Sequence, residues 1–432
     1  MRAVAPICVF SLLSLAACSD DGGEPAFTDT GGMMMVPGCT YSITTRAGAE
    51  PPRVSGKTIG PDPTPRHVHL GIVGDPMTSI VAQWRTKDDT TTAGSIRYGV
   101  GANLPEAQLT KEVQGLTFGY RASGTTTYRM HQAHLCGLEA GTTYSYQVGT
   151  GTSWSPIYTF HTAPDVVAHP DTESVISFIG DTRNAYDIWA QVIDLSMQRT
   201  PDLVLFSGDA ITFGYVQAEW DTFFETSEPL FATVPMVSTN GNHEGNAVNY
   251  YSQVAMPGDQ ENFGFSYGFA RIFVANDEPD DVTQVSTTIP QAMDADFAAH
   301  PEARWRILMH HQPMYSSGTV HGSNLELRTA WEPIIDKNHL DLVLNGHDHE
   351  YEISKPLAAG AVVPTTADGT VFVVAGGGGA DLYGFMTPGF WTDYIESTHN
   401  GTVLHVRRDT LTLDAFRTDG SAIPMGFSKT KP

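Results

Sequence analysis

Apolar and polar residues follow two different rhythms along the chain, and the change falls near residue 170. Between residues 66 and 163, short runs alternate apolar and polar positions, as in residues 67–72 and 79–84, with Gly and Asn turns between them. A period of two with frequent turns predicts a small antiparallel β-sandwich. We assign this sandwich to residues 61–165.

From residue 174 onward the rhythm becomes apolar strand, loop and amphipathic helix. Strands are predicted at residues 175–179, 203–206, 305–309 and 342–344, and helices at residues 187–199, 217–231 and 324–337. Because these strands are apolar almost throughout, both faces of their sheet must be covered. β patterns return after residue 350, and we interpret residues 170–432 as one catalytic α/β domain.

A run of four glycines at residues 376–379 follows a strand predicted at residues 370–375. Such a run can cradle a phosphate group or allow two backbone segments to pack closely. No helix with a Lys follows, as a phosphate-binding P-loop requires. We therefore favour close packing near the site.

Acid, amide and imidazole side chains follow the strands in five loops. Six of them form a candidate set of metal ligands: Asp181, Asp209, Asn242, His310, His347 and His349. The carboxyl ends of strands in such sheets line one crevice, so loops far apart in the sequence can converge there. A Gly directly precedes four of the six and permits tight turns and close backbone approach. The sequence therefore predicts a centre of two metal ions.

The six ligands divide between two ions. Asp209 is the candidate bridge, because paired ions in such centres lie about 3.5–4 Å apart and share a ligand. Asp181 and His349 complete the first ion, and the remaining three ligands complete the second. His311 is interpreted as a packing or supporting residue. Imidazole and carboxylate donors together are compatible with Fe, Zn or Mn.

The net charge narrows the range of partners. The chain has 48 acidic and 24 basic residues, a formal charge of −24 at pH 7. Nucleic-acid binding needs clustered Lys and Arg, so this charge argues against nucleic acid as a partner. A small anionic substrate must be held locally, by metal ions or by a few placed cations. The oligomeric state stays open.

The first residues resemble a processing signal. Arg2 precedes a mostly apolar stretch at residues 3–17 that is too short to span a bilayer as a helix. The stretch ends in Leu-Ala-Ala-Cys, which resembles a lipobox. We expect residues 1–17 to be a lipoprotein signal peptide, Cys18 to carry the lipid anchor, and residues 18–60 to form a flexible tether. Ordinary signal cleavage nearby is the alternative.

Two features bear on location. Ser19 follows the expected anchor, where an Asp is often linked with retention in the inner membrane, so we expect an exported lipoprotein of the outer membrane, facing the periplasm or the cell surface. Cys39 and Cys136 are two further cysteines, and thiols outside the cytoplasm often pair. The sequence does not fix that bond.

The five loops resemble the sequence blocks of calcineurin-like metallophosphoesterases, and most closely those of purple acid phosphatases. The blocks of that family are Asp-x-Gly, Gly-Asp-x-x-Tyr, Gly-Asn-His-Glu/Asp, Val-x-x-His and Gly-His-x-His. The corresponding segments are residues 181–183, 208–212, 241–244, 307–310 and 346–349. The resemblance implies a multidomain chain, with a fibronectin type III-like or immunoglobulin-like sandwich before a four-layer αββα domain.

The resemblance also implies a reaction. Members hydrolyse phosphate monoesters by attack of a metal-bound hydroxide at a binuclear centre, so we expect a phosphomonoesterase of the acid phosphatase type. His243 matches the family's phosphate-contacting histidine and is expected to protonate the leaving alkoxide. His321 lies near the position of further substrate histidines in plant members, and we assign it to substrate binding and catalysis as well.

Two positions depart from the family pattern. Thr212 stands at the Tyr ligand that gives these enzymes their colour, so we expect a colourless enzyme whose first metal need not be ferric; Tyr215 is the alternative ligand. Arg183 stands at a Gly of the family. Its planar fork suits a substrate phosphate, and the alternative is an ion pair with an acid such as Asp187.

Two other functions remain open at this point. One is a phosphodiesterase or nucleotidase, in which Arg183 and the loop at 246–265 would shape a pocket for a larger leaving group; the loop carries Tyr250, Tyr251, Phe263 and Phe265. The other is a surface lipoprotein without catalysis. Loss of activity should remove ligands first, yet only the Tyr is missing, so the sequence favours an enzyme.

Overall fold

The computed structural model describes residues 32–45, 60–88, 90–120 and 128–432. The expected signal peptide at residues 1–17 and the anchor residue Cys18 lie outside these ranges. Among the described residues, no helix is both long enough and apolar enough to cross a lipid bilayer.

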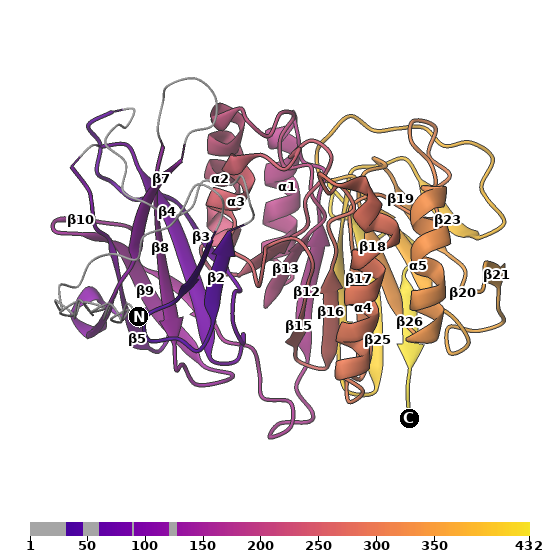
Figure 1. The fold of residues 1–432 in the computed structure, drawn as a ribbon, viewed down its shortest axis with the longest axis horizontal. Coiled ribbons are helices and arrows are strands. Elements are labelled where there is room, and N and C mark those ends of the chain that lie inside the picture. The colour runs from indigo at the N-terminus through magenta and orange to yellow at the C-terminus, as the bar shows by residue number, and fades with distance from the viewer. Residues whose placement is uncertain (1–31, 46–59, 89, 121–127) are drawn as a thin grey trace, which may run out of the picture.

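The first part of the chain is an all-β sandwich, shown at the left of Figure 1. One sheet contains β3 (Arg66–Gly71), β4 (Ser79–Thr86), β7 (Leu116–Tyr120) and β8 (Tyr128–Cys136). The facing sheet contains β5 (Ser95–Val100), β6 (Lys111–Gln114), β9 (Thr143–Thr150), β10 (Ser153–Trp154) and β11 (Tyr158–His161), with η1 (Glu106–Gln108) between β5 and β6. Trp84 from one sheet and Tyr144 and Tyr146 from the other share a buried cluster, which confirms the predicted sandwich.

A short hairpin precedes this sandwich. Strands β1 (Gly32–Met35) and β2 (Ser42–Thr45) pair antiparallel. Met34 is buried whereas its neighbours Met33 and Met35 are 76% and 61% exposed. We expected a flexible tether over residues 18–60, and that expectation is wrong for residues 32–45. Buried and exposed side chains alternate along residues 33–35, so the strand has one apolar face. The amino-acid composition of the segment does not reveal this alternation.

A disulfide ties the hairpin to the sandwich. Cys39 bonds to Cys136 at the end of β8, with their Cα atoms 5.4 Å apart. Below this bond Met34, Val36 and Ile43 pack against Val73 and Val81. The pairing that the sequence left open is therefore present in the structure.

The catalytic part begins with a sheet that continues the sandwich. Strands β12 (Ser174–Ile179), β13 (Leu203–Phe206) and β14 (Met236–Ser238) run parallel, and β14 pairs with β3 of the sandwich. On the other side follow β24 (Asn400–Val406), β25 (Thr410–Arg417) and β26 (Phe427–Thr430), giving a ten-stranded sheet. Helices α1 (Tyr186–Met197), α2 (Gln217–Phe231) and α3 (Val248–Gln253) follow its parallel strands in turn.

A second, seven-stranded sheet packs against the first. It contains β15 (Phe263–Tyr267), β16 (Ala270–Val274), β17 (Trp305–Met309), β18 (Leu342–Asn345), β22 (Val371–Ala375), β19 (Tyr351–Ser354) and β23 (Thr392–Glu396). The helices α4 (Thr288–Ala299) and α5 (Leu325–Lys337), with η2 (Val282–Ser286), cover its outer face, as Figure 1 shows at the right. Two short strands, β20 (Leu357–Ala358) and β21 (Ala361–Val362), form a separate hairpin.

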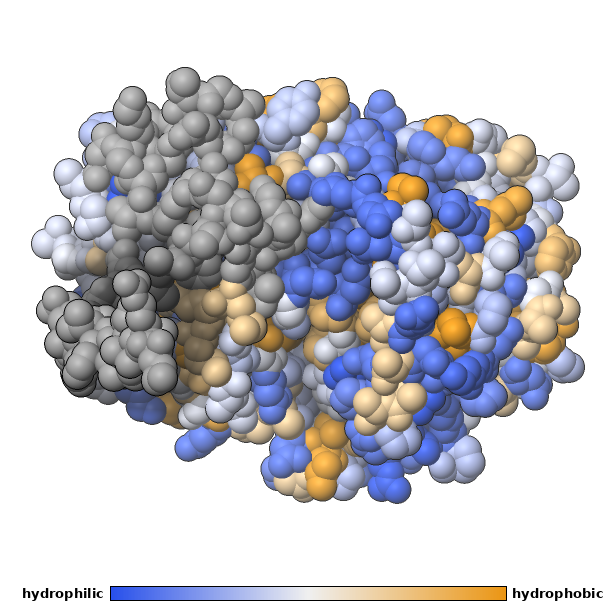
Figure 2. All heavy atoms as spheres, in the orientation of Figure 1, coloured by the Kyte–Doolittle hydropathy of each residue, from blue (hydrophilic) through white to orange (hydrophobic). Residues whose placement is uncertain are grey.

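The side chains of β17 show how the layers are organised. Ile307 and Met309 belong to the cluster between the two sheets, together with residues of β12, β13 and β24. Leu308 belongs instead to the cluster with Trp331 and Ile335 of α5. This alternation places helix, sheet, sheet and helix in four layers, and the predicted αββα arrangement is confirmed. Figure 2 shows that apolar residues on the viewed face lie singly or in small groups among hydrophilic ones.

Candidate metal centre

The predicted ligand loops leave the carboxyl ends of strands in both sheets, and three of their residues have unusual backbones. Asp181 follows β12, Asp209 follows β13, and His347 follows β18. Their φ angles are 58°, 57° and 70°, in the left-handed region that non-Gly residues seldom adopt. Backbone strain of this kind concentrates at functional sites.

Neighbouring glycines let these loops approach one another. A Cβ on Gly346 would lie 2.1 Å from Asp181 Oδ2, and a Cβ on Gly208 would lie 2.8 Å from Gly241 N. No side chain fits at either position. The predicted role of these glycines in close backbone approach is therefore confirmed.

Two groups of potential metal ligands result, and they share one residue. Asp181, Asp209 and His349 form the first group, and Asp209, His311 and His347 form the second. Within each group the donor atoms lie within 4.8 Å of one another, and every member is buried. Asp209 thus occupies the bridging position that the sequence suggested.

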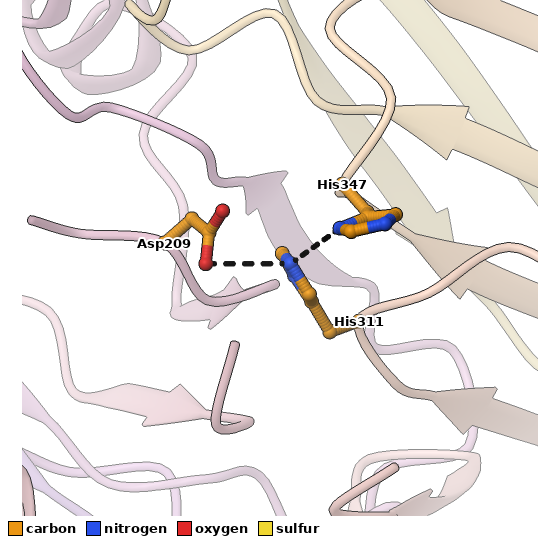
Figure 3. A group of neighbouring side chains, drawn as sticks. All are labelled: Asp209, His311 and His347. Carbon is orange, nitrogen blue, oxygen red and sulfur yellow. Dashed lines mark hydrogen bonds and ion pairs between the residues drawn. The ribbon is translucent and has the colours of Figure 1, made fainter. Parts of the chain in front are cut away.

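The second group has four converging donor atoms, because Asn242 joins it. His311 Nε2 lies 3.3 Å from Asp209 Oδ1 and 3.1 Å from Asn242 Oδ1. His347 Nδ1 lies 3.0 Å from the same Asn242 oxygen and 3.1 Å from His311 Nε2. Figure 3 shows His311 between Asp209 and His347.

His311 takes the place that we assigned to His310, so that assignment is wrong. The ring of His310 faces the opposite side of the sheet, where Nδ1 lies 3.0 Å from Asp277 Oδ2 and the ring edge meets Trp331 of α5. Side chains alternate across a strand. His310 therefore continues the face of Leu308, whereas His311 continues the face of Met309, between the sheets. The period-two pattern of β17 contained the signal that would have distinguished them.

Hydrogen bonds orient the imidazole rings for metal binding. His311 Nδ1 lies 2.7 Å from the carbonyl oxygen of Ser207, and His349 Nδ1 lies 2.6 Å from that of Asp381. A carbonyl oxygen only accepts, so each Nδ1 carries a proton and Nε2 is the ring nitrogen that faces the centre. Metal-bound histidines usually donate such a hydrogen bond from the ring nitrogen that does not bind the metal.

Burial and charge set the ionisation of the ligands. Burial lowers the pKa of His347 to about 2 and that of His349 to about 4, so both rings are neutral near pH 7. Burial alone would raise the pKa of Asp209, but His311 and His243 beside it hold that pKa below its usual range. Neutral imidazoles and an ionised carboxylate are the forms that bind metal ions.

An unsatisfied oxygen supports the same conclusion. Asp209 Oδ2 is buried and accepts no hydrogen bond from the described residues. A buried carboxylate oxygen without a hydrogen bond is costly, and a directly bound cation would satisfy it. The residues present therefore fit a pair of metal ions.

Glu244 holds two of the ligand loops together through their backbone N–H groups, a role that the sequence analysis did not predict. Its carboxylate accepts hydrogen bonds from the backbone N–H groups of Asp209, Ala210 and Gly241, at 2.8, 2.8 and 2.9 Å. It thereby joins the loop of Asp209 to the loop of Asn242. Burial and the nearby Asp209 charge raise the pKa of Glu244 to about 7.

Neither candidate for the family's Tyr ligand reaches the centre. The hydroxyl of Thr212 donates to Asn184 Oδ1 at 2.5 Å. Tyr215 is 55% exposed, with its ring against Phe213. The alternative of Tyr215 as a ligand is therefore wrong in this structure.

A different tyrosine, Tyr383, lies beside the first ligand group. Its ring stacks on His349, with the centroids 3.9 Å apart. It lies in a loop beyond β22, and nothing in the local sequence marks it, because only the fold brings that loop to His349.

Arg183 lies inside the centre. Its Nε is 3.6 Å from Asp209 Oδ2, and its Nη2 donates to His349 Nε2 at 3.2 Å and lies 3.1 Å from the Tyr383 hydroxyl. The acid that Arg183 meets is thus Asp209 rather than Asp187.

The two histidines assigned to substrate lie at the edge of the ligand groups. His243 Nδ1 lies 2.7 Å from the Thr212 carbonyl, and its Nε2 lies 3.9 Å from Asp209 Oδ2. The exposed ring of His321 lies over that of His347, with centroids 4.0 Å apart. Both rings therefore lie beside residues of the two ligand groups.

The four-glycine run packs closely behind Asp181. Gly378 N donates to the carbonyl of Gly180 at 3.0 Å, and a Cβ on Gly378 would lie 2.1 Å from that oxygen. The interpretation of this run as close backbone packing is confirmed.

Two families match consecutive parts of the chain. Residues 65–162 match the N-terminal domain of purple acid phosphatases, and residues 175–351 match the calcineurin-like phosphoesterases. The second match contains all the ligands found in the two groups.

Whole proteins give the same result. Purple acid phosphatase 18 of Arabidopsis thaliana is 26% identical over 332 residues, covering 73% of this chain and 71% of that protein. Human acid phosphatase type 7 is 26% identical over 398 residues, covering 83% and 88%. The solved structure of the purple acid phosphatase PPD1 from yellow lupin seeds superposes with a TM-score of 0.74 at 19% identity, covering 85% of this chain and 74% of that one. The chain is thus a purple acid phosphatase-like member of the calcineurin-like phosphoesterases.

Proposed function

We propose that this protein is a phosphatase that hydrolyses small organic phosphate monoesters at a centre of two metal ions. The observation that carries the proposal is the pair of buried ligand groups that share Asp209. Relatives named as acid phosphatases, from plants and from human, support the reaction class.

The ligands divide between the ions as two unequal sets. Asp181, Asp209 and His349 would hold one ion, and Asp209 with Asn242, His311 and His347 would hold the other. When bound, such ions supply Lewis acidity toward the phosphate and an activated water. We leave their identity among Fe, Zn and Mn to experiment.

The protein's own groups bind and orient the ester. His243 lies near the bridging carboxylate, with Nδ1 at the Thr212 carbonyl, so its Nε2 faces the centre. This placement supports its assignment as the group that protonates the leaving alkoxide. The ring of His321 lies over that of the ligand His347, which supports its assignment to substrate binding.

Exposed apolar residues stand beside His321 and Tyr383 in the chain. Val320, Phe385 and Met386 are 55%, 42% and 58% exposed. They adjoin His321 and Tyr383 in two loops that hydrogen-bond to each other, through Met386 N to the Ser317 carbonyl at 2.9 Å. These exposed apolar residues support a monoester whose leaving group is aromatic or otherwise apolar.

The loop at 246–265 gives no support to the diesterase alternative. The four aromatic residues of the loop at 246–265 are no more than 6% exposed and belong to the core rather than to a pocket: Tyr250, Tyr251, Phe263 and Phe265. They offer no surface for a second ester group.

We also propose that the protein is exported and anchored through a lipid on Cys18. The Cys39–Cys136 disulfide supports export, since such bonds persist in oxidising compartments. Cys18→Ala should move the protein from the membrane fraction to the soluble one when expressed in a Gram-negative host. An unchanged distribution would contradict the anchor.

The reaction is tested by comparing two aryl esters. The purified chain, freed of metal and then reloaded with Fe, Zn or Mn, should hydrolyse an aryl phosphate monoester at least about tenfold faster than the matching diester. Turnover of the diester alone would replace this proposal with a diesterase. Metal loading without turnover of either ester would contradict both.

A further inference from the structure

Arg183 places a permanent positive charge within the first ligand group. Its guanidinium lies between Asp209 Oδ2, 3.6 Å from Nε, and His349 Nε2, 3.2 Å from Nη2. The side chain is only 14% exposed, and Nε is buried without a hydrogen-bond partner among the described residues. The guanidinium thus lies against two of the three groups that would hold a metal ion.

His349 cannot serve Arg183 and a metal ion at once. Its Nδ1 donates to the Asp381 carbonyl, so Nε2 has a single lone pair directed into the centre. That lone pair accepts the N–H of Arg183 in this structure. A metal ion bound there must displace the guanidinium.

Coulomb repulsion adds to this competition. A guanidinium and a divalent ion a few ångströms apart repel each other strongly in a site screened from water. Of the second group, the guanidinium contacts the shared Asp209, and no described contact joins it to His311, His347 or Asn242. The charge of Arg183 therefore opposes a metal ion in the first group, where it contacts two ligands, more than in the second, where it contacts the shared Asp209 alone.

The first group is also short of donors. Three residues form it, whereas Asn242 gives the second group a fourth donor atom. The hydroxyl of Thr212 points to Asn184 and supplies no further ligand. Tyr383 approaches this group, but its hydroxyl lies 3.1 Å from Arg183 Nη2 and holds the guanidinium instead.

We propose that Arg183 competes with a metal ion for the group formed by Asp181, Asp209 and His349, so that this group fills second and fills more tightly when a phosphate-like anion binds. A planar guanidinium pairs well with phosphate oxygens. An anion in the centre draws Arg183 off His349 and frees the lone pair for the metal. This inference rests on the binuclear centre proposed above. If it holds, a metal ion occupies the first ligand group more fully when substrate is bound.

The test is a calorimetric titration of the metal-free full-length protein with Mn²⁺, with and without phenylphosphonate, a soluble analogue of an aryl phosphate that is not hydrolysed. The wild type should bind one ion tightly and a second at least tenfold more weakly, and phenylphosphonate should strengthen the second about tenfold. In Arg183→Gln the second ion should bind about tenfold more tightly without the anion, and the anion should add less than twofold.

Arg97→Gln is the matched control, since it removes an arginine from the N-terminal sandwich, where Arg97 lies over Trp154. It should reproduce the wild-type titration. Two equal affinities in the wild type, or no effect of phenylphosphonate on it, would overturn the inference without use of any variant. An equal gain from the anion in Arg183→Gln would also overturn it. Absence of any metal binding in the wild type would reject the binuclear centre itself.

Discussion

At the scale of single residues, the chemistry depends on which of two adjacent histidines faces the crevice. His311 contacts Asp209, Asn242 and His347, whereas His310 contacts Asp277 and Trp331 on the helix-covered side. Neighbouring residues on a strand point to opposite faces. One position along the chain therefore separates a ligand from a structural residue.

His311→Ala should remove the metal ion of the second group and lower turnover more than 100-fold, beyond the roughly 10–100-fold that loss of a supporting hydrogen bond costs. His310→Ala should keep both ions but lower the free energy of unfolding by about 2–4 kcal/mol, because it opens a cavity against Trp331 and removes a partner of buried Asp277. Metal content and urea unfolding of the two variants check this contrast. Retention of both ions by His311→Ala would restore His310 as the ligand.

At the scale of elements, strands and helices could be predicted from the sequence where apolar residues recur at a regular spacing. The strands before Asp181 and Asp209 and the helix at 324–337 were predictable, because apolar runs and a helical period mark them directly. The one-residue error at His310 came from reading the end of β17 as a loop rather than as a continuing alternation. Arg183 contacts Tyr383, 200 residues away, and no local pattern encodes such a contact.

Strand β8 carries two buried histidines that make the sandwich sensitive to acid. Burial lowers the pKa of His131 and of His134 to about 3 each. Because these pKa values are depressed in the folded state, the unfolded chain takes up protons that the folded chain does not. The free energy of unfolding therefore falls as the pH drops below about 6.5, by about 1.4 kcal/mol per pH unit for each ring.

His134→Gln should reduce this acid sensitivity. Between pH 6.5 and 5 the wild type should lose about 2 kcal/mol more of its free energy of unfolding than the variant does. Urea unfolding at the two pH values measures the difference. Equal losses in the two proteins would show that His134 does not remain neutral when folded.

At the scale of the whole molecule, the N-terminal sandwich and the catalytic layers share structure. Strand β14 pairs with β3 through Met236 and Gly71, which makes one sheet continuous across both parts. Helix α2 is held from the sandwich side, where Tyr146 donates to the Ala232 carbonyl at 2.8 Å and Tyr158 donates to Glu228 at 2.6 Å. The sandwich thus supports the helix that follows the loop of Asp209.

This shared sheet predicts that the two parts unfold together. Differential scanning calorimetry of the metal-free chain should give one transition whose calorimetric and van't Hoff enthalpies agree. Two separated transitions would mean that the sandwich and the catalytic part are independent domains joined by a weak contact.

The central claim is that Asp209 bridges two metal ions that carry out phosphate ester hydrolysis. The most direct measurement is the metal content and the aryl phosphate turnover of Asp209→Asn beside the wild type, because this change keeps the shape of the side chain and removes its charge. We predict two ions per chain in the wild type, and in the variant at most one ion with turnover reduced more than 100-fold. Two ions and undiminished turnover in Asp209→Asn would contradict the shared bridge and the mechanism that depends on it.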